Sequence, residues 1–522
     1  MEKRYFVSSK EMKQYDMVTI EYFQVPSMVL MERAALAVVE EVEKRFLSGS
    51  KVLIVAGSGN NGGDGIAIGR LLMQRGYEVD FTLIGDRDRC SEQTSVQLTI
   101  IEKYECPLQA KIGDGEYDII IDALFGIGLS KDVSGIYAES IEKVNSLGGF
   151  VFAVDIPSGI SADTGEVKET AVKADVTVTF AYEKIGHIFY PGCEYCGEVV
   201  CKDIGITKES FRGKEPLVYS YAIDYEKKAR FMTHLLPERK KSGNKGTFGK
   251  VLTIAGSRNM SGACELCVRS AYRSGAGMVK AVTPEENREI IQRNVPEALL
   301  TTYETEGREE MLLEQLGGDI EWADSIVIGP GMGKSQMAYR ILSYVIGESG
   351  KPLIIDADGL NLIAESEELK AELKQSGYER NRQVILTPHV AEFARLYGCT
   401  PIQVKRDMFG KTKELARELG CVVLCKDART IVASFKEEDL FLNTTGNDGM
   451  ATAGSGDVLA GILGGLAAQG LGAFEAAKRG VFLHGMLGDM AAERMGRHAL
   501  MAGDMIEQLK YITSEGRESY VC

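Results

Sequence analysis

The chain repeatedly places short runs of purely apolar residues between segments with helical periodicity. Over the first 210 residues these runs include KVLIVAG at 51–57, YDIIIDALFG at 117–126 and GFVFAVDIPSG at 149–159. They are hydrophobic throughout, which is the pattern of strands buried on both faces of a parallel sheet. Helix-like segments such as IAIGRLLMQRG at 66–76 separate them. We therefore predict a doubly wound α/β fold with a largely parallel, Rossmann-like sheet.

A second series of the same kind begins after a polar stretch, at about 211–245, that is rich in Lys, Arg and Glu. It includes KVLTIAGS at 250–257, DSIVIGPGMG at 324–333 and QVILTPH at 383–389. At 522 residues the chain is too long for one compact core. We therefore predict two tandem α/β domains joined by the polar stretch.

The composition restricts the class of protein. With 44% hydrophobic and 26% charged residues, the chain has the balance of a soluble globular protein. Its formal net charge of −15 argues against nucleic acid or an anionic membrane as the main partner. The short basic stretch at 239–241 does not change that expectation, because a solvated linker explains it.

The eleven cysteines and the first residues indicate the compartment. Most cysteines lie in apolar segments, such as GCVVLCK at 420–426, which is typical of a reducing compartment. The two CxxC pairs, at 193/196 and 264/267, lie too far apart in the sequence for a zinc ribbon, and we expect buried thiols. The segment 1–13 has no apolar signal core, and no long apolar span follows. We expect a cytoplasmic protein.

The segment NDGMATAGSGDVLAG at 447–461 is rich in small residues and runs into a helix-like stretch. A helix start without bulky side chains leaves backbone N–H groups free to bind a phosphate, and the helix dipole reinforces this binding. Asp457, at the mouth of such a site, would take a proton from a substrate hydroxyl beside the phosphate. The alternative is that Asp457 is only an N-cap and the glycines only a turn. So many small residues in a row favour the phosphate site.

An earlier glycine-rich loop follows the run at 51–57. Gly57, Gly59 and Gly62 fit GxGxxG, so dinucleotide binding has to be considered. The loop also carries Asn60, Asn61 and Asp64, and no acidic residue ends the next apolar run, FTLIG at 81–85. We therefore predict a phosphate cradle whose polar side chains bind a further group. A plain strand–helix turn remains the alternative.

Three aspartates follow apolar runs of the first domain. They are Asp64, Asp122 and Asp155, and Ser158 stands beside the last. Because ligands of open α/β sheets bind at the carboxyl ends of strands, we expect these side chains to share one edge of the sheet. Three carboxylates there would hold a cation or carry out acid–base chemistry.

Residues 8–206 resemble the NAD(P)H-hydrate epimerase domain, on the strength of NNGGDG at 60–65, DALFGIG at 122–128 and VDIPSG at 154–159. The resemblance implies that Asp155 is the catalytic carboxylate and that the loop 126–132 wraps the substrate phosphates. The implied potassium ligands are Asn61, Asp122 and Ser158. The implied substrate-binding residues are Asn60, Asn61, Gly62, Gly63, Asp64, Gly126, Ile127, Gly128, Leu129, Ser130, Lys131, Asp132 and Asp155.

Residues from about 225 onward resemble the ADP-dependent NAD(P)H-hydrate dehydratase, which has a ribokinase-like fold. The matching segments follow in order along most of the domain and include KGTFGKVLTIAGS, IGPGMG, IDADGLN, LTPHVAEFARL, KDARTIV and TTGNDGMATAGSGDVLAG. The two resemblances place the domains at 1–214 and 225–522. The implied substrate-binding residues are Ala263, Gly331, His389 and Asp457. The implied nucleotide-binding residues are Lys426, Asp427, Ala428, Arg429, Thr430 and Gly456.

The chemistry that the second resemblance implies suits these residues. A hydrated nicotinamide ring carries a hydroxyl that leaves poorly, and phosphorylation turns it into a good leaving group. The reaction then needs a base, a seat for the phosphoryl group and magnesium. We expect Asp457 to be the base and Glu392, in the HxxE of TPHVAEF, to orient a metal-bound water.

Other side chains near these motifs have two interpretations. His389 follows an apolar run and a proline, which favours a site over a core imidazole. Asp356 and Asp358 either line the substrate pocket or cap a helix. The remaining histidines match no site motif, and we expect structural roles for them: His187, His234, His484 and His498.

The resemblances imply a bifunctional repair enzyme for hydrated NADH and NADPH. The first domain would interconvert the R and S epimers, and the second would dehydrate the S epimer with ADP, or with ATP, as the co-substrate. Magnesium and potassium are the expected cations, and we expect a homo-oligomer. The alternative is a vitamin-precursor-like small-molecule kinase fused to a nucleotide-binding module. A first domain that only binds or scaffolds is a third hypothesis.

Overall fold

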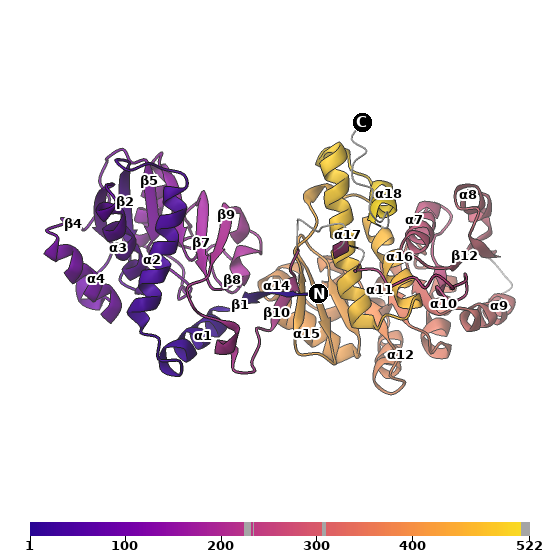
Figure 1. Ribbon diagram of the computed structural model, residues 1–522. Helices are drawn as coiled ribbons and strands as arrows, with labels where there is room; N and C mark the ends of the chain where they lie inside the picture. The colour runs from indigo at the N-terminus through magenta and orange to yellow at the C-terminus, as the bar shows by residue number, and fades with distance from the viewer. Residues whose placement is uncertain (224–230, 233, 305–308, 513–522) are drawn as a thin grey trace. The chain divides into compact units, whose positions relative to one another are not determined.

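The computed structural model describes residues 1–223, 231–232, 234–304 and 309–512 (Figure 1). The chain divides into two compact units, Tyr5–Val218 and Tyr219–Cys522, and Met1–Arg4 belong to the second of them. We expected the first domain at 1–214, but Met1–Arg4 group with the second unit. No helix in the described ranges is both long and apolar enough to cross a membrane.

The first unit is built on a seven-stranded sheet in the order β4-β3-β2-β5-β6-β7-β9, and all six neighbouring pairs are parallel. The predicted Rossmann-like α/β fold is confirmed. The order changes direction at β2, which lies between β3 and β5, and ligands of such sheets bind at this point. The strands are β2 (Lys51–Ala56), β3 (Glu78–Leu83), β4 (Leu108–Gln109), β5 (Ile119–Ala123), β6 (Phe150–Val154), β7 (Val176–Phe180) and β9 (Glu198–Lys202).

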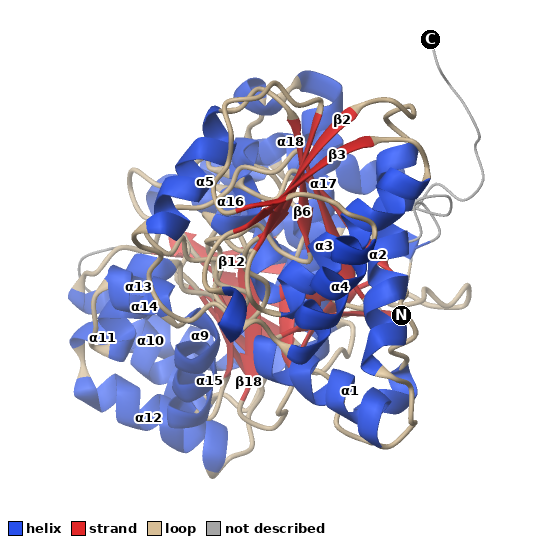
Figure 2. Ribbon diagram, turned by 90° about the vertical axis from the view of Figure 1, so that its left-hand side faces the viewer, coloured by secondary structure: helices blue, strands red, loops and turns tan. Residues whose placement is uncertain are grey.

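Helices cover both faces of this sheet. Alternate residues of β2 enter opposite cores, since Val52 and Ile54 belong to one cluster and Leu53 and Val55 to the other. Figure 2 shows α5 on one side of the sheet and α3 and α4 on the other. The helices are α1 (Ser9–Glu21), α2 (Ser27–Glu43), α3 (Asn60–Gln74), α4 (Glu92–Lys103) and α5 (Ile136–Ser146). This double burial explains why the runs are hydrophobic throughout.

The first unit also contains two strands outside its seven-stranded sheet. Strand β1 (Lys3–Val7) pairs in parallel with the two-residue strand β8 (Glu183–Lys184), which leads into a 3₁₀ helix, Ile185–His187. Helix α1 begins with a capping box: Glu11 N donates to Ser8 Oγ (3.2 Å), and Ser8 N donates to Glu11 Oε2 (2.8 Å).

The second unit has a mixed sheet in the order β13-β12-β11-β14-β15-β16-β17-β18-β19-β10. The pairs from β13 to β17 are parallel, and β17, β18 and β19 form antiparallel hairpins. Strand β10 lies inside the stretch 211–245 that we predicted as a linker. The strands are β10 (Val218–Tyr221), β11 (Lys250–Ile254), β12 (Met278–Pro284), β13 (Leu299–Tyr303), β14 (Ser325–Ile328), β15 (Leu353–Ile355), β16 (Val384–Leu386), β17 (Val422–Cys425), β18 (Thr430–Ser434) and β19 (Leu440–Asn443).

Helix α16 (Ser455–Ala468) is the central helix of the second unit, and every residue from Val458 to Ala468 is buried. Its Gly461 packs so closely on α7 that a side chain would collide with Ser270 Oγ. The other helices are α7 (Ser261–Arg273), α8 (Arg288–Asn294), α9 (Glu309–Trp322), α10 (Gln336–Glu348), α11 (Asp358–Glu365), α12 (Glu367–Tyr378), α13 (Val390–Tyr397), α14 (Pro401–Arg406), α15 (Met408–Leu419), α17 (Ala473–Met495) and α18 (Ala502–Ile512).

Candidate active sites

The first unit contains a cavity of about 700 Å³ that is bordered by the residues following β2, β5, β6 and β7. Its size lies within the usual range for small-molecule sites. Helices α1 and α2 form another part of its wall. Most of the residues expected to contact substrate line it: Asn60, Asn61, Asp64, Gly126, Ile127, Gly128, Leu129, Ser130, Lys131 and Asp155.

Gly62, Gly63 and Asp132, which we also expected at the substrate, do not line this cavity. A side chain at Gly62 would collide with the carbonyl oxygen of Gly57, and one at Gly63 would lie 2.7 Å from Met31 Cε. Glycine at both positions therefore serves the close packing of the loop and α3. Gly59, the N-cap of α3, supplies no side-chain cap.

Asp122 and Ser158 lie outside the cavity lining and bind each other. Ser158 N donates to Asp122 Oδ2 (2.8 Å), and Ser158 Oγ donates to Asp122 Oδ1 (2.6 Å). Both side chains are fully buried, and this burial raises the pKa of Asp122 to about 6. Asn61 lines the cavity, and its buried Nδ2 has no hydrogen-bond partner among the residues that the structure describes. Within the described ranges no group of three or more His, Cys, Asp or Glu side chains is arranged to hold a metal ion.

Asp155, directly after β6, is held by a network that the sequence did not predict. Its Oδ1 accepts hydrogen bonds from Thr179 Oγ1 (3.0 Å), Phe180 N (3.3 Å) and Lys184 Nζ. His187 Nε2 lies 2.9 Å from the carbonyl oxygen of Asp155. Thr179 lies on β7, and Lys184 lies on β8, where no sequence motif marked it.

Two further carboxyl groups line the same cavity as Asp155. Burial raises the pKa of Asp16 and of Asp64, and the nearby Asp155 carboxylate adds to both shifts. Like Lys184, Asp16 on α1 is a residue of this site that no sequence motif marked. The cavity therefore brings three carboxyl groups together: Asp16, Asp64 and Asp155. Asp64 and Asp155 were predicted there. Asp122, the third aspartate that we expected at this edge, does not line the cavity.

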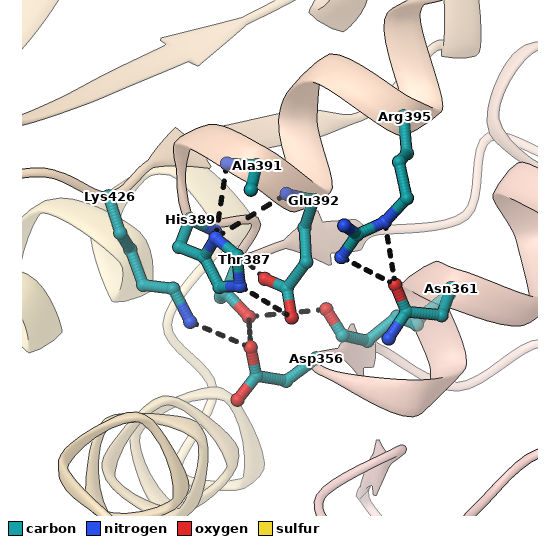
Figure 3. Close-up of polar contacts among 9 residues, drawn as sticks. Asp356, Asn361, Thr387, His389, Ala391, Glu392, Arg395 and Lys426 are labelled. Carbon is teal, nitrogen blue, oxygen red and sulfur yellow. Dashed lines mark hydrogen bonds and ion pairs between the residues drawn. The ribbon is translucent and has the colours of Figure 1, made fainter. Parts of the chain in front are cut away.

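In the second unit, the carboxyl ends of β15, β16 and β17 bring a charged cluster to the start of α16 (Figure 3). Lys426 Nζ lies 2.8 Å from Asp356 Oδ1, and Thr387 Oγ1 donates to the same oxygen (2.7 Å). A methyl group placed on Gly456 would lie 3.4 Å from Lys426 Nζ and 3.5 Å from Asp356 Oδ2. Gly456 therefore borders this ion pair.

The start of α16 has the open backbone expected of a phosphate seat. Its N-cap is Gly454, with φ +92° and no side-chain cap, so Asp457 is not the N-cap. The first hydrogen bond of the helix runs from Val458 N to Gly454 O (3.1 Å). The N–H groups of Gly456 and Asp457 precede this ladder and are available to a ligand.

Asp457 and Lys426 influence each other's charge. Burial raises the pKa of Asp457 to about 7, and the Asp356 carboxylate adds to the shift while Lys426 opposes it. Burial works against charge on Lys426, but Asp356, Glu392 and Asp457 together raise its pKa. Asp457 is therefore poised to change its protonation state near neutral pH.

His389 is the N-cap of α13 and not a core imidazole, since 52% of its side chain is exposed. Its Nδ1 accepts from Ala391 N (3.1 Å), while Glu392 Oε2 accepts from His389 N (2.9 Å) (Figure 3). Glu392 is buried by this capping box, and its other oxygen lies 3.4 Å from His389 Nε2. The main chain of His389 forms an isolated parallel bridge with Lys426, so this residue lies beside the charged cluster.

The other predicted residues of the second unit lie in loops or near the ends of helices and strands. A methyl group on Gly331, whose φ is +58°, would lie 2.8 Å from Ala263 Cβ, so these two residues are neighbours. Asp358 accepts from Gly333 N (2.8 Å) and thereby holds the adjoining loop. The predicted nucleotide-binding segment after Lys426 spans the turn of the β17–β18 hairpin, Asp427, Ala428 and Arg429, and the first residue of β18, Thr430.

Two family models match this chain, one in each of its two units. A family model described as NAD(P)H-hydrate dehydratase matches residues 251–510, and one described as YjeF-related protein N-terminus matches residues 27–186. A bifunctional NAD(P)H-hydrate repair enzyme of Moorella thermoacetica is 35% identical over 97% of this chain and 96% of its own length. The enzyme of that name from Escherichia coli is 31% identical over 93% of this chain and 89% of its own length.

A solved structure is also similar to the second unit. It is the ADP/ATP-dependent NAD(P)H-hydrate dehydratase of Bacillus subtilis, co-crystallised with ATP and Mg²⁺. It is 28% identical, covers 54% of this chain and 95% of its own, and has a TM-score of 0.47.

Proposed function

The chain belongs to the family of bifunctional NAD(P)H-hydrate repair enzymes, and we propose that the cavity of the first unit and the start of α16 are its two active sites. The family unites an epimerase domain and a dehydratase domain, and both family models match this chain in the same order. The small-molecule kinase that the start of α16 by itself allows is not favoured, because full-length relatives carry the repair-enzyme name.

The dehydratase chemistry is carried by the start of α16. The hydroxyl of the hydrated ring is a poor leaving group until it is phosphorylated, and its proton has to be removed first. We assign that step to Asp457, whose pKa of about 7 suits a base at neutral pH. The N–H groups of Gly456 and Asp457 then hold the transferring phosphoryl group, and Lys426 adds a fixed positive charge.

The charged cluster at this site supports a nucleotide co-substrate, and we propose ADP. Asp356 holds the Lys426 ammonium beside Gly456, where it would meet the nucleotide's phosphates. Asp356 is paired with Lys426 and Glu392 caps α13, so the site fits a magnesium ion that arrives on the nucleotide. Such an ion would neutralise phosphate charge.

The epimerase chemistry is assigned to Asp155. Inverting the carbon that carries the hydroxyl requires a bond at that carbon to break and form again, and each direction moves a proton at the hydroxyl oxygen. Asp155 lines the cavity and would accept and return that proton. The loop of residues 126–131 forms another part of the same wall, where it would contact the rest of the dinucleotide.

We further propose that potassium binds beside this cavity. Asn61, Asp122 and Ser158 offer the oxygen ligands that hard cations prefer. The orphaned Nδ2 of Asn61 supports this, because turning the amide over would replace the unpartnered donor by an oxygen. A bound cation would offset the charge of the fully buried Asp122.

One incubation tests both activities. The protein is mixed with chemically hydrated NADPH, with and without ADP or ATP, and both epimers are followed by chromatography. We expect interconversion of the epimers without nucleotide, and recovery of NADPH only when nucleotide is present. A stable phosphorylated alcohol in place of NADPH would instead support the kinase alternative. Size-exclusion chromatography of the same sample tests the predicted homo-oligomer.

A further inference from the structure

We infer that Lys184 is a positioning residue of the epimerase site: it fixes one oxygen of the Asp155 carboxylate and leaves the other to the substrate. The inference rests on the proposed function of the first unit. Lys184 follows β7 by four residues and forms part of β8, so the short turn between these strands returns its side chain to the carboxyl end of β6.

The hydrogen bonds of Lys184 exclude a direct role in binding substrate. Its ammonium has three N–H donors, and they go to Asp155 Oδ1, Thr179 Oγ1 (2.8 Å) and Phe180 O (3.2 Å). Only 1% of the side chain is exposed, although it reaches the cavity wall. With every donor in use, Lys184 acts on the substrate only through Asp155.

The contacts of Asp155 are divided unequally between its two oxygens. Oδ1 accepts three hydrogen bonds, from Thr179 Oγ1, Phe180 N and Lys184 Nζ. Across the described chain, Oδ2 accepts none, and Asp155 lines the cavity. Oδ2 is therefore the oxygen that faces a ligand and exchanges a proton with it.

Thr179 closes the network between the two charged groups. Its hydroxyl donates to Asp155 Oδ1 (3.0 Å) and accepts from Lys184 Nζ (2.8 Å). Because the Thr179 hydroxyl, the Lys184 ammonium and Asp155 Oδ1 are all satisfied, the three side chains hold one arrangement inside the protein. A carboxylate fixed in this way loses less freedom when it engages a substrate.

His187 secures the main chain at both ends of the ion pair. Its Nδ1 accepts from Lys184 N (3.1 Å), so its Nε2 carries the hydrogen and donates to Asp155 O (2.9 Å). Burial lowers the pKa of His187 to about 4, which keeps the ring neutral. Asp155 has φ +68°, a conformation that a non-glycine residue keeps only when its surroundings impose it.

The Lys184–Asp155 ion pair distinguishes Asp155 from the two neighbouring carboxyl groups of the cavity. Asp16 and Asp64 also line the cavity, and in the part of the chain that the structure describes neither forms an ion pair. Asp155 is the member of the three that has a buried cation beside it. The positive charges facing the cavity elsewhere, Lys13 and Lys131, come from α1 and from the loop after β5.

The test compares Lys184→Met and Lys184→Arg with the full-length wild type, in epimerisation assays without nucleotide so that the dehydratase is silent. For Lys184→Met we expect kcat to fall by about 100-fold or more and KM to stay within about twofold, since no donor to the substrate is lost. Lys184→Arg, which keeps the cation, should recover part of kcat. An unchanged kcat in Lys184→Met, or a loss confined to KM, would overturn the inference.

A second comparison applies even where Lys184→Met unfolds because Asp155 is left buried without its cation. The double variant Lys184→Met/Asp155→Asn carries neither charge and is compared with Asp155→Asn alone. Equal residual rates support a role exerted through Asp155, whereas a further loss of tenfold or more overturns it.

Lys202→Met is the matched control, because Lys202 pairs with Glu41 (2.7 Å) and does not line the cavity. Its kinetics should equal those of the wild type. If the wild type itself fails to interconvert the epimers, the proposed function falls and this inference with it. If the wild type is active and Lys184→Met equals it, only the inference falls.

Discussion

Lys426 Nζ lies 2.8 Å from Asp356 Oδ1, and this ion pair borders the open backbone at the start of α16. The two residues are 70 positions apart. Asp356 follows β15 and Lys426 follows β17, and β16 lies between these strands in the sheet. Asp356 is anchored in turn by Thr387. The charged group that would meet a phosphate in the proposed site is therefore held in place before any ligand binds.

Removing Lys426 should weaken nucleotide binding and destabilise the second unit. Lys426→Met leaves the buried Asp356 without a cation, and breaking such a pair costs about 3 kcal/mol. We expect the KM for ADP in the dehydratase reaction to rise at least about tenfold. Calorimetric unfolding and steady-state kinetics measure the two effects. Lys405→Met, which removes the exposed Lys405–Asp427 pair, is the control and should leave stability unchanged within about 0.5 kcal/mol.

Gly456→Ala should separate function from stability. Its added methyl would meet Lys426 Nζ at 3.4 Å and Asp356 Oδ2 at 3.5 Å, and φ is not positive there, so the fold tolerates it. Alanine also favours a helix over glycine by about 1 kcal/mol. The methyl occupies the proposed phosphate seat, so we expect an unchanged or higher melting temperature and weaker ADP binding by titration calorimetry.

Gly454→Ala is the matched comparison, two residues earlier. Gly454 has φ +92°, and an added methyl would lie 2.5 Å from Leu266 Cδ1. We expect this variant to lose stability. Equal nucleotide affinity for Gly456→Ala and the wild type would contradict a phosphate seat at this helix start.

Asp457→Asn should abolish ADP-driven recovery of NADPH and leave epimerisation intact. A general base contributes about 10² to 10⁴-fold, so we expect a loss of that size in the dehydratase rate. The wild-type rate should also depend on pH. Because the pKa of Asp457 is raised to about 7 and the base works only when ionised, the rate should fall about tenfold per unit below pH 7. Dehydratase activity in Asp457→Asn at the wild-type level would refute the assignment.

His187 and His484 should remain neutral until the solution is strongly acidic. Burial lowers the pKa of each to about 4, from an ordinary value of 6.5. Ring proton signals followed by NMR should therefore show no titration of these two residues between pH 5 and 8, and His187→Gln assigns one of them. The unfolded chain binds these protons more readily, so each histidine lowers stability by about 1.4 kcal/mol per unit as pH falls from 6.5 towards 4. Titration midpoints near 6.5 would show that the rings are not buried.

The strands could be predicted from the sequence because each buried strand is a continuous run of apolar residues. The run at 51–57 became β2, the run at 117–126 contains β5, and alternate residues of β2 enter the two cores. A strand covered on both faces must be apolar at every position, whatever lies around it. The catalytic roles of Asp155 and Asp457 stay predictions: the first rests on the family resemblance, and the second on a helix start that follows a run of small residues.

The surroundings of individual motif residues could not be predicted in this way. The substrate contact expected of Gly62 stays a prediction, and in the structure this glycine packs against Gly57 and lies outside the cavity lining. Asp155 follows β6, whereas Asp122 lies inside β5. The Asp122 side chain is bound to Ser158, outside the cavity lining. A motif specifies the residue type, whereas the direction of its side chain depends on partners supplied by other strands.

The sequence by itself therefore determined the two α/β domains and the family, and it supports the proposal of a phosphate site at the start of α16, because each depends on residues close together in the chain. Only the tertiary structure decided that Lys184 holds Asp155 across 29 positions and that Lys426 holds Asp356 across 70. The physical reason is that a buried ion pair depends on distance and desolvation in the folded state, and neither is encoded in the spacing of residues along the chain.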